Sequence, residues 1–213
     1  MITVHHLGVS QSERVVWLCE ELGIPYTLRR YERDPVTKLA PQAYRALHPM
    51  GIAPVITDGD VVLPESGAIL EYLIAKYGQG RLAVTAAAPD FADYLFWFHF
   101  ANGTLMPSEM SALLSAMPGV GGDNPILAIF RARAERAYAL IEARLQAVPF
   151  FAGAEFTAAD IMMFFPLTTM RAFSRRDLGS LPALRAYLAR IGERPAYRRA
   201  LAKADPGMAP LLS

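Results

Sequence analysis

The chain has 213 residues, enough for one large domain or two small ones with a substantial hydrophobic core. Its 21 basic and 20 acidic side chains leave a formal net charge of +1, which gives no electrostatic basis for binding nucleic acid or an anionic membrane. Apolar residues make up 53% of the chain, but no run approaches the roughly 20 apolar residues that span a bilayer. The apolar surplus therefore predicts a buried helical core, a subunit interface or an apolar pocket.

A single cysteine, Cys19, cannot form an intramolecular disulfide, and the sequence has no Cys-x-x-Cys motif. The first residues, Ile2–Leu7, resemble a strand and lack the pattern of a secretory signal. Together these observations predict a cytoplasmic protein that is not a dithiol oxidoreductase.

The first 78 residues alternate strand and helix signals. In chain order they predict a strand Ile2–Leu7, a helix Glu13–Leu22 ended by Gly23, a strand from Pro25, a short helix Pro41–Leu47, a hairpin Val55–Thr57 with Val61–Leu63, and a helix Gly67–Tyr77. Asp58-Gly59 between the hairpin strands predicts a type I′ turn. The order βαβα followed by ββα predicts a thioredoxin-like α/β domain over residues 1–78.

Residues 79–89 are predicted to be a linker, and residues 90–213 an all-α helical-bundle domain. The helical spacing covers Tyr94–Ala116, Ile126–Val148, Pro182–Gly192 and Ala196–Ala204, with a Gly- and Pro-rich loop at 118–125. Thr157 and Asp160 have the spacing of a capping box. They precede the apolar run Ile161–Met170, which we expect to be the buried central helix of this half.

Glu65-Ser66 stands between the hairpin and the helix that follows it. Ser66 is a good N-cap, and the N–H groups of the next helical turn attract a carboxylate. Glu65 instead attracts an ammonium group. A ligand with an amine and a carboxylate on one carbon satisfies both, and this is the head of an amino acid.

The segment Pro49–Tyr72 resembles the glutathione-binding half of a glutathione transferase, and the order of elements extends the resemblance over essentially the whole chain. The resemblance implies a cis Ala53-Pro54 bond, with Ala53 pairing through its backbone with the cysteinyl part of glutathione. It also implies that Glu65 and Ser66 hold the γ-glutamyl end. Glutathione is then a co-substrate, no cofactor or metal is expected, and the protein is expected to be a homodimer.

Residues 8–23 resemble a bacterial and fungal subgroup of serine-type, theta-like transferases, with Gln11 in place of the subgroup's usual arginine. The resemblance implies that Ser10 donates a hydrogen bond to the glutathione thiolate. Two alternatives to Ser10 as the thiolate donor remain open. In the first, Ser12 is the donor. In the second, neither serine is the donor, and Ser10-Gln11-Ser12-Glu13 is only a capping box that starts the helix. The preceding His5 and His6 alternate across the strand, so one is expected to face the core and the other solvent.

The glycyl carboxylate of glutathione needs a cation or N–H donors. Lys38 lies where related sequences carry a basic or polar contact, whereas Ile52 replaces the usual lysine and cannot pair with a carboxylate. The electrophile pocket is expected between the first loop and the helical half. Its candidate lining residues are Val9, Phe98, Asn102 and Met106, the last three at i, i+4 and i+8 of one helix, a spacing that core residues also have.

The sequence leaves three functional hypotheses. The first is a glutathione S-transferase that conjugates glutathione to small apolar electrophiles. The second is a glutathione-dependent isomerase, dehalogenase or peroxidase that acts on a specific metabolite. The third is a non-catalytic, transferase-like dimer that binds apolar ligands or another protein.

Overall fold

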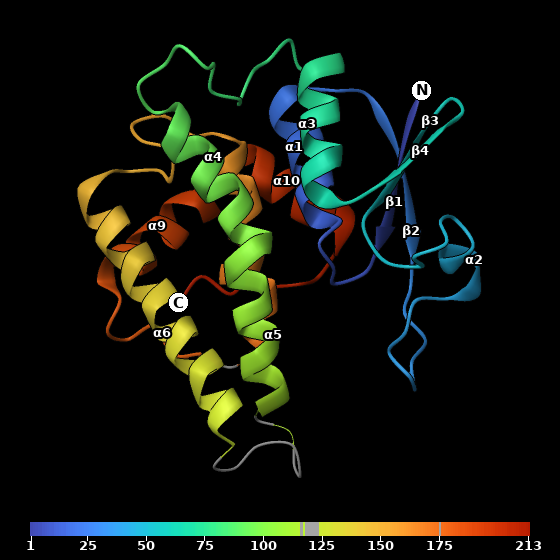
Figure 1. Cartoon of the computed structure of the whole chain (residues 1–213). Helices are drawn as coiled ribbons and strands as arrows, with labels where there is room; N and C mark the ends of the chain where they lie inside the picture. The colour runs from blue at the N-terminus through green and yellow to red at the C-terminus, as the bar shows by residue number, and fades with distance from the viewer. Residues whose placement is uncertain (116, 118–123, 175) are drawn as a thin grey trace. The chain divides into compact units, whose positions relative to one another are not determined.

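The computed structural model describes residues 1–115, 117, 124–174 and 176–213, and these form two compact units (Figure 1). Unit 1 comprises Met1–Ala83 and Glu193–Ala209, and unit 2 comprises Val84–Gly192 and Pro210–Ser213. This division differs from the predicted boundary, because residues 193–209 were assigned to the helical domain and belong instead to unit 1.

Unit 1 is built on a four-stranded sheet with the thioredoxin-like order that the sequence predicts. The strands are β1 (Ile2–Leu7), β2 (Tyr26–Tyr31), β3 (Val55–Asp58) and β4 (Val61–Pro64). They lie in the order β2-β1-β3-β4, with β1 parallel to β2 and antiparallel to β3, and with β3 antiparallel to β4. The strand β1 is therefore an interior strand of the sheet.

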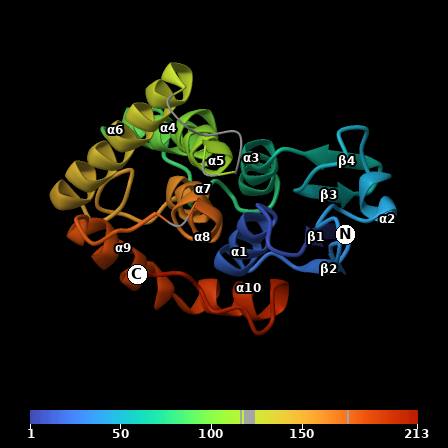
Figure 2. The same cartoon turned by 90° about the horizontal axis from the view of Figure 1, so that it is seen from below.

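Helices cover both faces of this sheet. The helices α1 (Glu13–Leu22), α3 (Ser66–Lys76) and α10 (Pro195–Ala204) lie on one face, and the short α2 (Gln42–Arg45) lies on the other (Figures 1 and 2). Gly23 ends α1 in the left-handed conformation, with φ of 67°, as a C-terminal glycine is predicted to do.

Charged and aromatic contacts attach α10 to α1, which explains why α10 belongs to unit 1. The Glu20 carboxylate lies 3.0 Å from Arg199 Nε and 2.5 Å from Lys203 Nζ, and Glu21 lies 2.8 Å from Arg194 Nε. These contacts match the basic residues of α10 to the acidic end of α1. Helical periodicity alone could not predict this pairing, because it says nothing about which element a helix packs against.

The predicted hairpin is present, but its turn type is wrong. Asp58 pairs with Val61, so the loop is Gly59-Asp60, and of these two residues Gly59 alone has a positive φ, of 59°. A positive φ at the first loop residue fits a type II′ turn, whereas type I′ requires it at both. Asp58 instead ends β3, where its carboxylate accepts hydrogen bonds from the side chains of Tyr72, Lys76 and Tyr77.

Unit 2 is helical, and its described residues contain no strand, as the sequence predicts. Its helices are α4 (Phe91–Phe100), a π-helical turn η1 (Ala101–Leu105), α5 (Met106–Ser115), α6 (Pro125–Ala147), α7 (Ala158–Leu167), α8 (Thr169–Ser174) and α9 (Pro182–Gly192). The π-helical turn interrupts the single helix predicted from Tyr94. That helix's predicted last residue, Ala116, and most of the predicted loop at 118–125 lie outside the described residues.

The predicted capping box starts α7. The Thr157 hydroxyl accepts the Ala159 N–H at 3.3 Å, and Asp160 Oδ2 accepts the Thr157 N–H at 2.8 Å. All ten residues of α7 are buried, which confirms it as a central helix of unit 2. The predicted helix runs too long, however, because Thr168 leaves the helical conformation and separates α7 from α8. Over the described ranges, no helix has the length and apolar character needed to cross a membrane.

Candidate functional site: the loop between β1 and α1 and its neighbours in unit 1

The loop between β1 and α1 is held in a strained conformation. Val9 has φ of 51°, which β-branched residues rarely adopt. Its N–H donates to Asp205 Oδ1 at 3.0 Å, and Arg33 Nε donates to the carbonyl of Gly8 at 2.9 Å. Strain of this kind persists where surrounding contacts fix the backbone, and it is common at functional sites.

The Ser10 hydroxyl does not form the capping box that was one alternative for this segment. Ser10 Oγ lies 2.7 Å from the carbonyl oxygen of Leu7 and 2.7 Å from Ser12 Oγ. The N–H of Glu13 donates instead to the main-chain carbonyl of Ser10 at 3.1 Å. The N-cap residue of α1 is Ser12, and its side chain makes no capping bond. The capping-box alternative for Ser10 is therefore wrong.

Ser12 continues into a buried chain of polar groups. Its Oγ lies 2.8 Å from His6 Nδ1, and His6 Nε2 lies 3.2 Å from Asp205 Oδ2. Burial raises the pKa of Asp205, but the hydrogen bond and charge of His6, the Val9 N–H and the charge of Arg30 together hold that pKa below its usual value. Asp205 lies 196 positions after Val9, and no local signal in the sequence indicates its role.

Both histidines are buried, so the expectation that one faces solvent is wrong. They do lie on opposite faces of β1. His5 Nδ1 lies 3.0 Å from the hydroxyl of Tyr31, whereas His6 lies against Ser12 and Asp205. The physical reason is the interior position of β1, whose two faces are both covered by helices of unit 1.

The Ala53-Pro54 peptide bond is cis, as the resemblance implied. Ala53 is partly buried and packs against the apolar cluster that contains Leu7, Tyr44 and Val55. Ile52, directly before it, is 47% exposed. The turn before β3 therefore presents an apolar side chain where the family pattern has a cation.

The start of α3 differs by one residue from the prediction. Glu65 is exposed, has φ of 70° and occupies the N-cap position, while Ser66 is the buried first residue of the helix. Ser66 is therefore not the N-cap. Its Oγ lies 3.1 Å from Nη1 of Arg14, a fully buried residue of α1. The same guanidinium nitrogen donates to Gln11 Oε1, so Gln11 binds a side chain of its own helix start.

Arg14 places a positive charge behind the start of α3. Burial lowers the pKa of its guanidinium to about 9, so the group remains protonated at neutral pH. A buried cation at a helix N-terminus strengthens the attraction of that terminus for an anion. No motif in the sequence pointed to Arg14, because its role depends on the long-range contact with Ser66.

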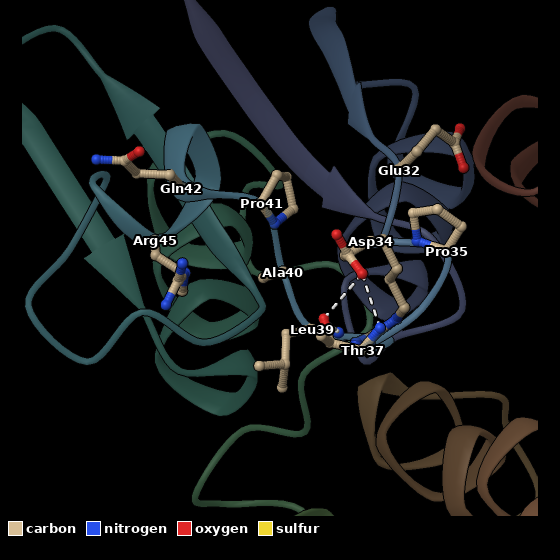
Figure 3. A pocket seen from close by; sticks show the side chains of 10 residues that line it. Glu32, Asp34, Pro35, Thr37, Leu39, Ala40, Pro41, Gln42 and Arg45 are labelled. Carbon is tan, nitrogen blue, oxygen red and sulfur yellow. Dashed lines mark hydrogen bonds between the residues drawn. The ribbon is translucent and has the colours of Figure 1, made fainter.

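A cavity of about 600 Å³ lies in the segment between β2 and α2 (Figure 3). Its lining includes the acidic residues Glu32 and Asp34 and the basic residues Arg33 and Arg45. The Arg45 side chain lies 3.5 Å from the point that a Cβ on Gly51 would occupy, and Gly51 immediately precedes Ile52. The predicted contact Lys38 is exposed in the same segment and has φ of 60°. Arg45 is therefore a second cation near this segment, and no motif distinguished it.

The predicted electrophile contacts have different environments. Val9 is 37% exposed, and Asn102 and Met106 are half-buried. Phe98 is 1% exposed and packs on Tyr94 with ring centroids 5.7 Å apart, as a core residue of unit 2 does. Asn102 lies in the π-helical turn, which breaks the regular i, i+4, i+8 spacing. The pocket itself stays a prediction.

The described part of the chain holds no group of three or more His, Cys, Asp or Glu side chains that could bind a metal ion. Cys19 is fully buried, and burial, with the nearby charge of Glu20, raises the pKa of its thiol to about 12. A thiol of this kind is almost entirely protonated at neutral pH and does not act as a nucleophile.

The four-stranded sheet, the cis-proline and the helix start at Glu65-Ser66 give unit 1 the architecture expected of a glutathione transferase N-terminal domain. Comparison with known proteins agrees. The family model of the glutathione S-transferase N-terminal domain matches residues 5–81, and that of the C-terminal domain matches residues 124–190.

Individual relatives cover the whole chain. Glutathione S-transferase 3 of Schizosaccharomyces pombe is 32% identical over 100% of this chain and 92% of that protein. A crystal structure of a glutathione S-transferase from Actinobacillus pleuropneumoniae is 31% identical, covers 96% of this chain and 93% of that one, and has a TM-score of 0.87. The disulfide-bond oxidoreductase YfcG of Escherichia coli is 25% identical over 97% of each chain. The chain belongs to the glutathione S-transferase family.

Proposed function

We propose that this protein binds glutathione in unit 1, lowers the pKa of its thiol through Ser10 and transfers the thiolate to small apolar electrophiles. The observation that carries this proposal is the Ser10 hydroxyl at the start of α1, which does not cap the helix and is 6% exposed. Ser12 is fully buried, so Ser10 is the better placed of the two candidate donors. The relatives named glutathione S-transferases support the same activity.

The γ-glutamyl end of glutathione binds at the start of α3 in this proposal. The exposed Glu65 carboxylate pairs with the ligand's ammonium group. The ligand's carboxylate binds the first turn of α3 at Ser66, where the helix dipole and the buried Arg14 both favour an anion. Positive φ at Glu65 sets the direction in which its side chain leaves the backbone.

The cysteinyl part pairs with the backbone of Ala53, and its sulfur receives the hydrogen bond of Ser10. Lowering the pKa of the thiol from about 8.5 to about 6.5 requires roughly 2.7 kcal/mol of preferential stabilisation of the anion. A hydroxyl donor together with the N-terminal end of α1 supplies an effect of this size.

The glycyl carboxylate has two candidate cations, Lys38 and Arg45. Arg45 is favoured because it lines the cavity between β2 and α2 and lies beside Gly51, where an added Cβ would be 3.5 Å from its aliphatic carbons (Figure 3). Either residue replaces the cation that Ile52 does not provide. We further propose that the protein is a cytoplasmic homodimer that needs neither a metal nor another cofactor and binds no nucleic acid.

Isomerase, dehalogenase and peroxidase reactions use the same glutathione thiolate and form the second candidate function. The similarity to a disulfide-bond oxidoreductase favours including disulfide chemistry among them. Because Cys19 is buried and its pKa is raised to about 12, any such reaction relies on the thiols of glutathione.

Two measurements on the purified protein test the proposal. Retention on immobilised glutathione reports binding, and the ultraviolet absorbance of the bound thiolate reports activation. We expect both signals, and turnover of a generic aryl halide. Retention without a thiolate signal would favour the non-catalytic dimer, and loss of both signals would refute glutathione as the ligand.

A further inference from the structure

Four side chains of unit 1 form a continuous polar chain that begins at the proposed thiol site. Ser10 Oγ lies 2.7 Å from Ser12 Oγ, Ser12 Oγ lies 2.8 Å from His6 Nδ1, and His6 Nε2 lies 3.2 Å from Asp205 Oδ2. His6 and Ser12 are fully buried. The proposed function uses the Ser10 hydroxyl alone and leaves the other three groups without a role.

We propose that this chain is a proton relay, in which His6 takes up the proton that the glutathione thiol loses when the thiolate forms. The proposal rests on the proposed function, because it needs a thiol at Ser10. It makes Ser10 the group that touches the ligand, Ser12 and His6 the path of the proton, and Asp205 a positioning residue.

The donors and acceptors of the chain fit this role. With His6 neutral, its Nε2 lies 3.2 Å from Asp205 Oδ2, and its Nδ1 accepts the Ser12 hydroxyl proton at 2.8 Å. The Ser10 hydroxyl then donates to Ser12 Oγ or to the carbonyl of Leu7, both at 2.7 Å. Each hydroxyl thus has an acceptor on the side that leads to His6.

One concerted shift of protons moves the chain to its second state. The S–H bond of the thiol breaks and its proton goes to Ser10 Oγ, the Ser10 proton goes to Ser12 Oγ, and the Ser12 proton goes to His6 Nδ1. The thiolate now accepts a hydrogen bond from Ser10, Ser10 accepts from Ser12, and Ser12 accepts from the imidazolium. The net charge is unchanged, and the stored proton leaves to solvent or to the departing group after the thiolate has reacted.

The surroundings of His6 favour a stored positive charge. Asp205, which follows α10, lies against His6, and Arg30 is the register partner of His6 on β2. Arg33 interacts electrostatically with Asp205, and the Glu32 carboxylate lies beside Gly8. Asp205 Oδ2 lies 3.2 Å from His6 Nε2, and the other carboxylate oxygen accepts the Val9 N–H at 3.0 Å. The same carboxylate therefore stabilises the imidazolium and fixes the loop that carries Ser10.

The number of protons released separates a relay from a merely structural contact. Glutathione is titrated into the protein near neutral pH, and thiolate is measured by its absorbance. Calorimetry in two buffers of different ionisation enthalpy gives the protons released to the buffer. For the wild type we expect thiolate to form with well under one proton released per thiolate. A structural role for His6 predicts one proton released for each thiolate formed.

The variants are chosen to stop the relay at different points. In His6→Gln, the glutamine forms hydrogen bonds but cannot take up a proton. The protein should then release one proton to the buffer for each thiolate that still forms. The value of kcat should fall about 10- to 100-fold, while KM for glutathione changes little. Asp205→Asn retains an acceptor for the Val9 N–H and removes the negative charge, and Ser12→Ala breaks the path. Both Asp205→Asn and Ser12→Ala should therefore release one proton to the buffer for each thiolate formed. His5→Gln, on the opposite face of β1, is the matched control and should keep the wild-type proton count.

Each possible outcome either supports or overturns the proton relay. One proton released per thiolate by the wild type, or a wild-type proton count in His6→Gln, overturns the relay and leaves the proposed function intact. A wild type that forms no thiolate overturns both. If His6→Gln fails to fold, as circular dichroism would show, the proton counts of Asp205→Asn and Ser12→Ala decide in its place.

Discussion

Two helix starts in this protein share one sequence pattern and use it differently. Thr157-Ala-Ala-Asp160 forms a complete capping box, in which Asp160 accepts hydrogen bonds from the N–H groups of Thr157 and Phe151 and from the Tyr187 hydroxyl. Ser10-Gln-Ser-Glu13 forms no such box.

The difference lies in the backbone of α1. The N–H groups of Glu13, Arg14 and Val15 already donate to the carbonyls of the preceding turn. The hydroxyls of Ser10 and Ser12 therefore do not cap α1, and they bond instead to the main chain before the helix, to each other and to His6. A capping-box pattern predicts where a helix begins, whereas the hydrogen bonds of its side chains show whether they serve stability or chemistry.

The largest expected effect tests the chemical half of this comparison. Ser10→Ala should lower turnover of an aryl halide by about one to three orders of magnitude, the usual scale for losing one oriented donor to an anion. Glutathione affinity should change little, because the rest of the tripeptide is bound elsewhere. The free energy of unfolding should fall by about 1 kcal/mol, because the buried Ser10 hydroxyl bonds to Leu7 and Ser12. The same loss of stability with full activity would mean that the Ser10 hydroxyl is structural only. Normal activity in Ser10→Ala with a crippled Ser12→Ala would assign the donor to Ser12.

The structural half is tested at Asp160. Asp160→Ala removes the acceptor of four groups in the buried core of unit 2, so the free energy of unfolding should fall by about 2–4 kcal/mol. Chemical denaturation measures this directly. Glutathione affinity of the folded fraction should match the wild type. If Asp160→Ala has the stability of the wild type, the capping box of α7 does not contribute to stability.

The pH dependence of stability sharpens the same contrast. Burial raises the pKa of Asp160 to about 6, despite its hydrogen bonds, whereas an unfolded carboxyl has a pKa of about 3.9. Between these values the folded state binds the additional proton, so the contribution to stability is complete below about pH 4 and lost as the pH rises through about 6. The wild-type advantage over Asp160→Asn should shrink by roughly 1–3 kcal/mol across this window. An advantage that grows with pH would mean that the hydrogen bonds outweigh burial.

Glu65 tests a third helix start, where the exposed side chain is predicted to bind a ligand directly. Glu65→Ala removes the partner of the ammonium group, and glutathione affinity measured by calorimetry should fall about ten-fold. Glu71→Ala, which removes another exposed carboxylate of α3, is the matched control and should bind normally. Equal affinities of the two variants would refute the proposed γ-glutamyl site.

The smallest expected effect concerns a charged side chain that binds the ligand away from any helix N-terminus. Ile52→Lys should raise glutathione affinity about two- to five-fold, and added salt should reduce the gain. Turnover at saturating glutathione should barely change, because the contact is equal in the ground and transition states. Arg45→Ala gives the reciprocal measurement. If Ile52→Lys binds no better, residue 52 does not approach the glycyl carboxylate.

Local signals in the sequence predicted much of unit 1. The bounds of β1 and α1 agree with the prediction because alternating and helical apolar patterns act over a few residues, and Gly23 ends α1 for a reason visible in the sequence. The hairpin was found for the same reason. Its turn type was not, because Asp58 takes part in a hydrogen-bonded group with α3 and is thereby held in the strand.

Long-range contacts account for what the sequence did not reveal. No pattern connects His6 to Asp205, since their contact depends on α10 returning to α1. Phe98 has the spacing of a pocket residue and the burial of a core residue, and spacing alone cannot separate the two. The hydroxyls of Ser10 and Ser12 fit a capping box equally well until the main-chain hydrogen bonds of α1 are known.

The membership of α10 in unit 1 has a consequence for synthesis of the chain on the ribosome. Residues 1–83 emerge first, followed by all of Val84–Gly192, and only then the helix that covers α1. At about 5–20 residues per second, the wait is on the order of ten seconds. During that time Trp17 lacks its ring contact with Tyr197, and the Val9 N–H lacks Asp205. The nascent N-terminal segment thus exposes an apolar helix face, a surface that chaperones bind, until nearly the whole chain has been translated.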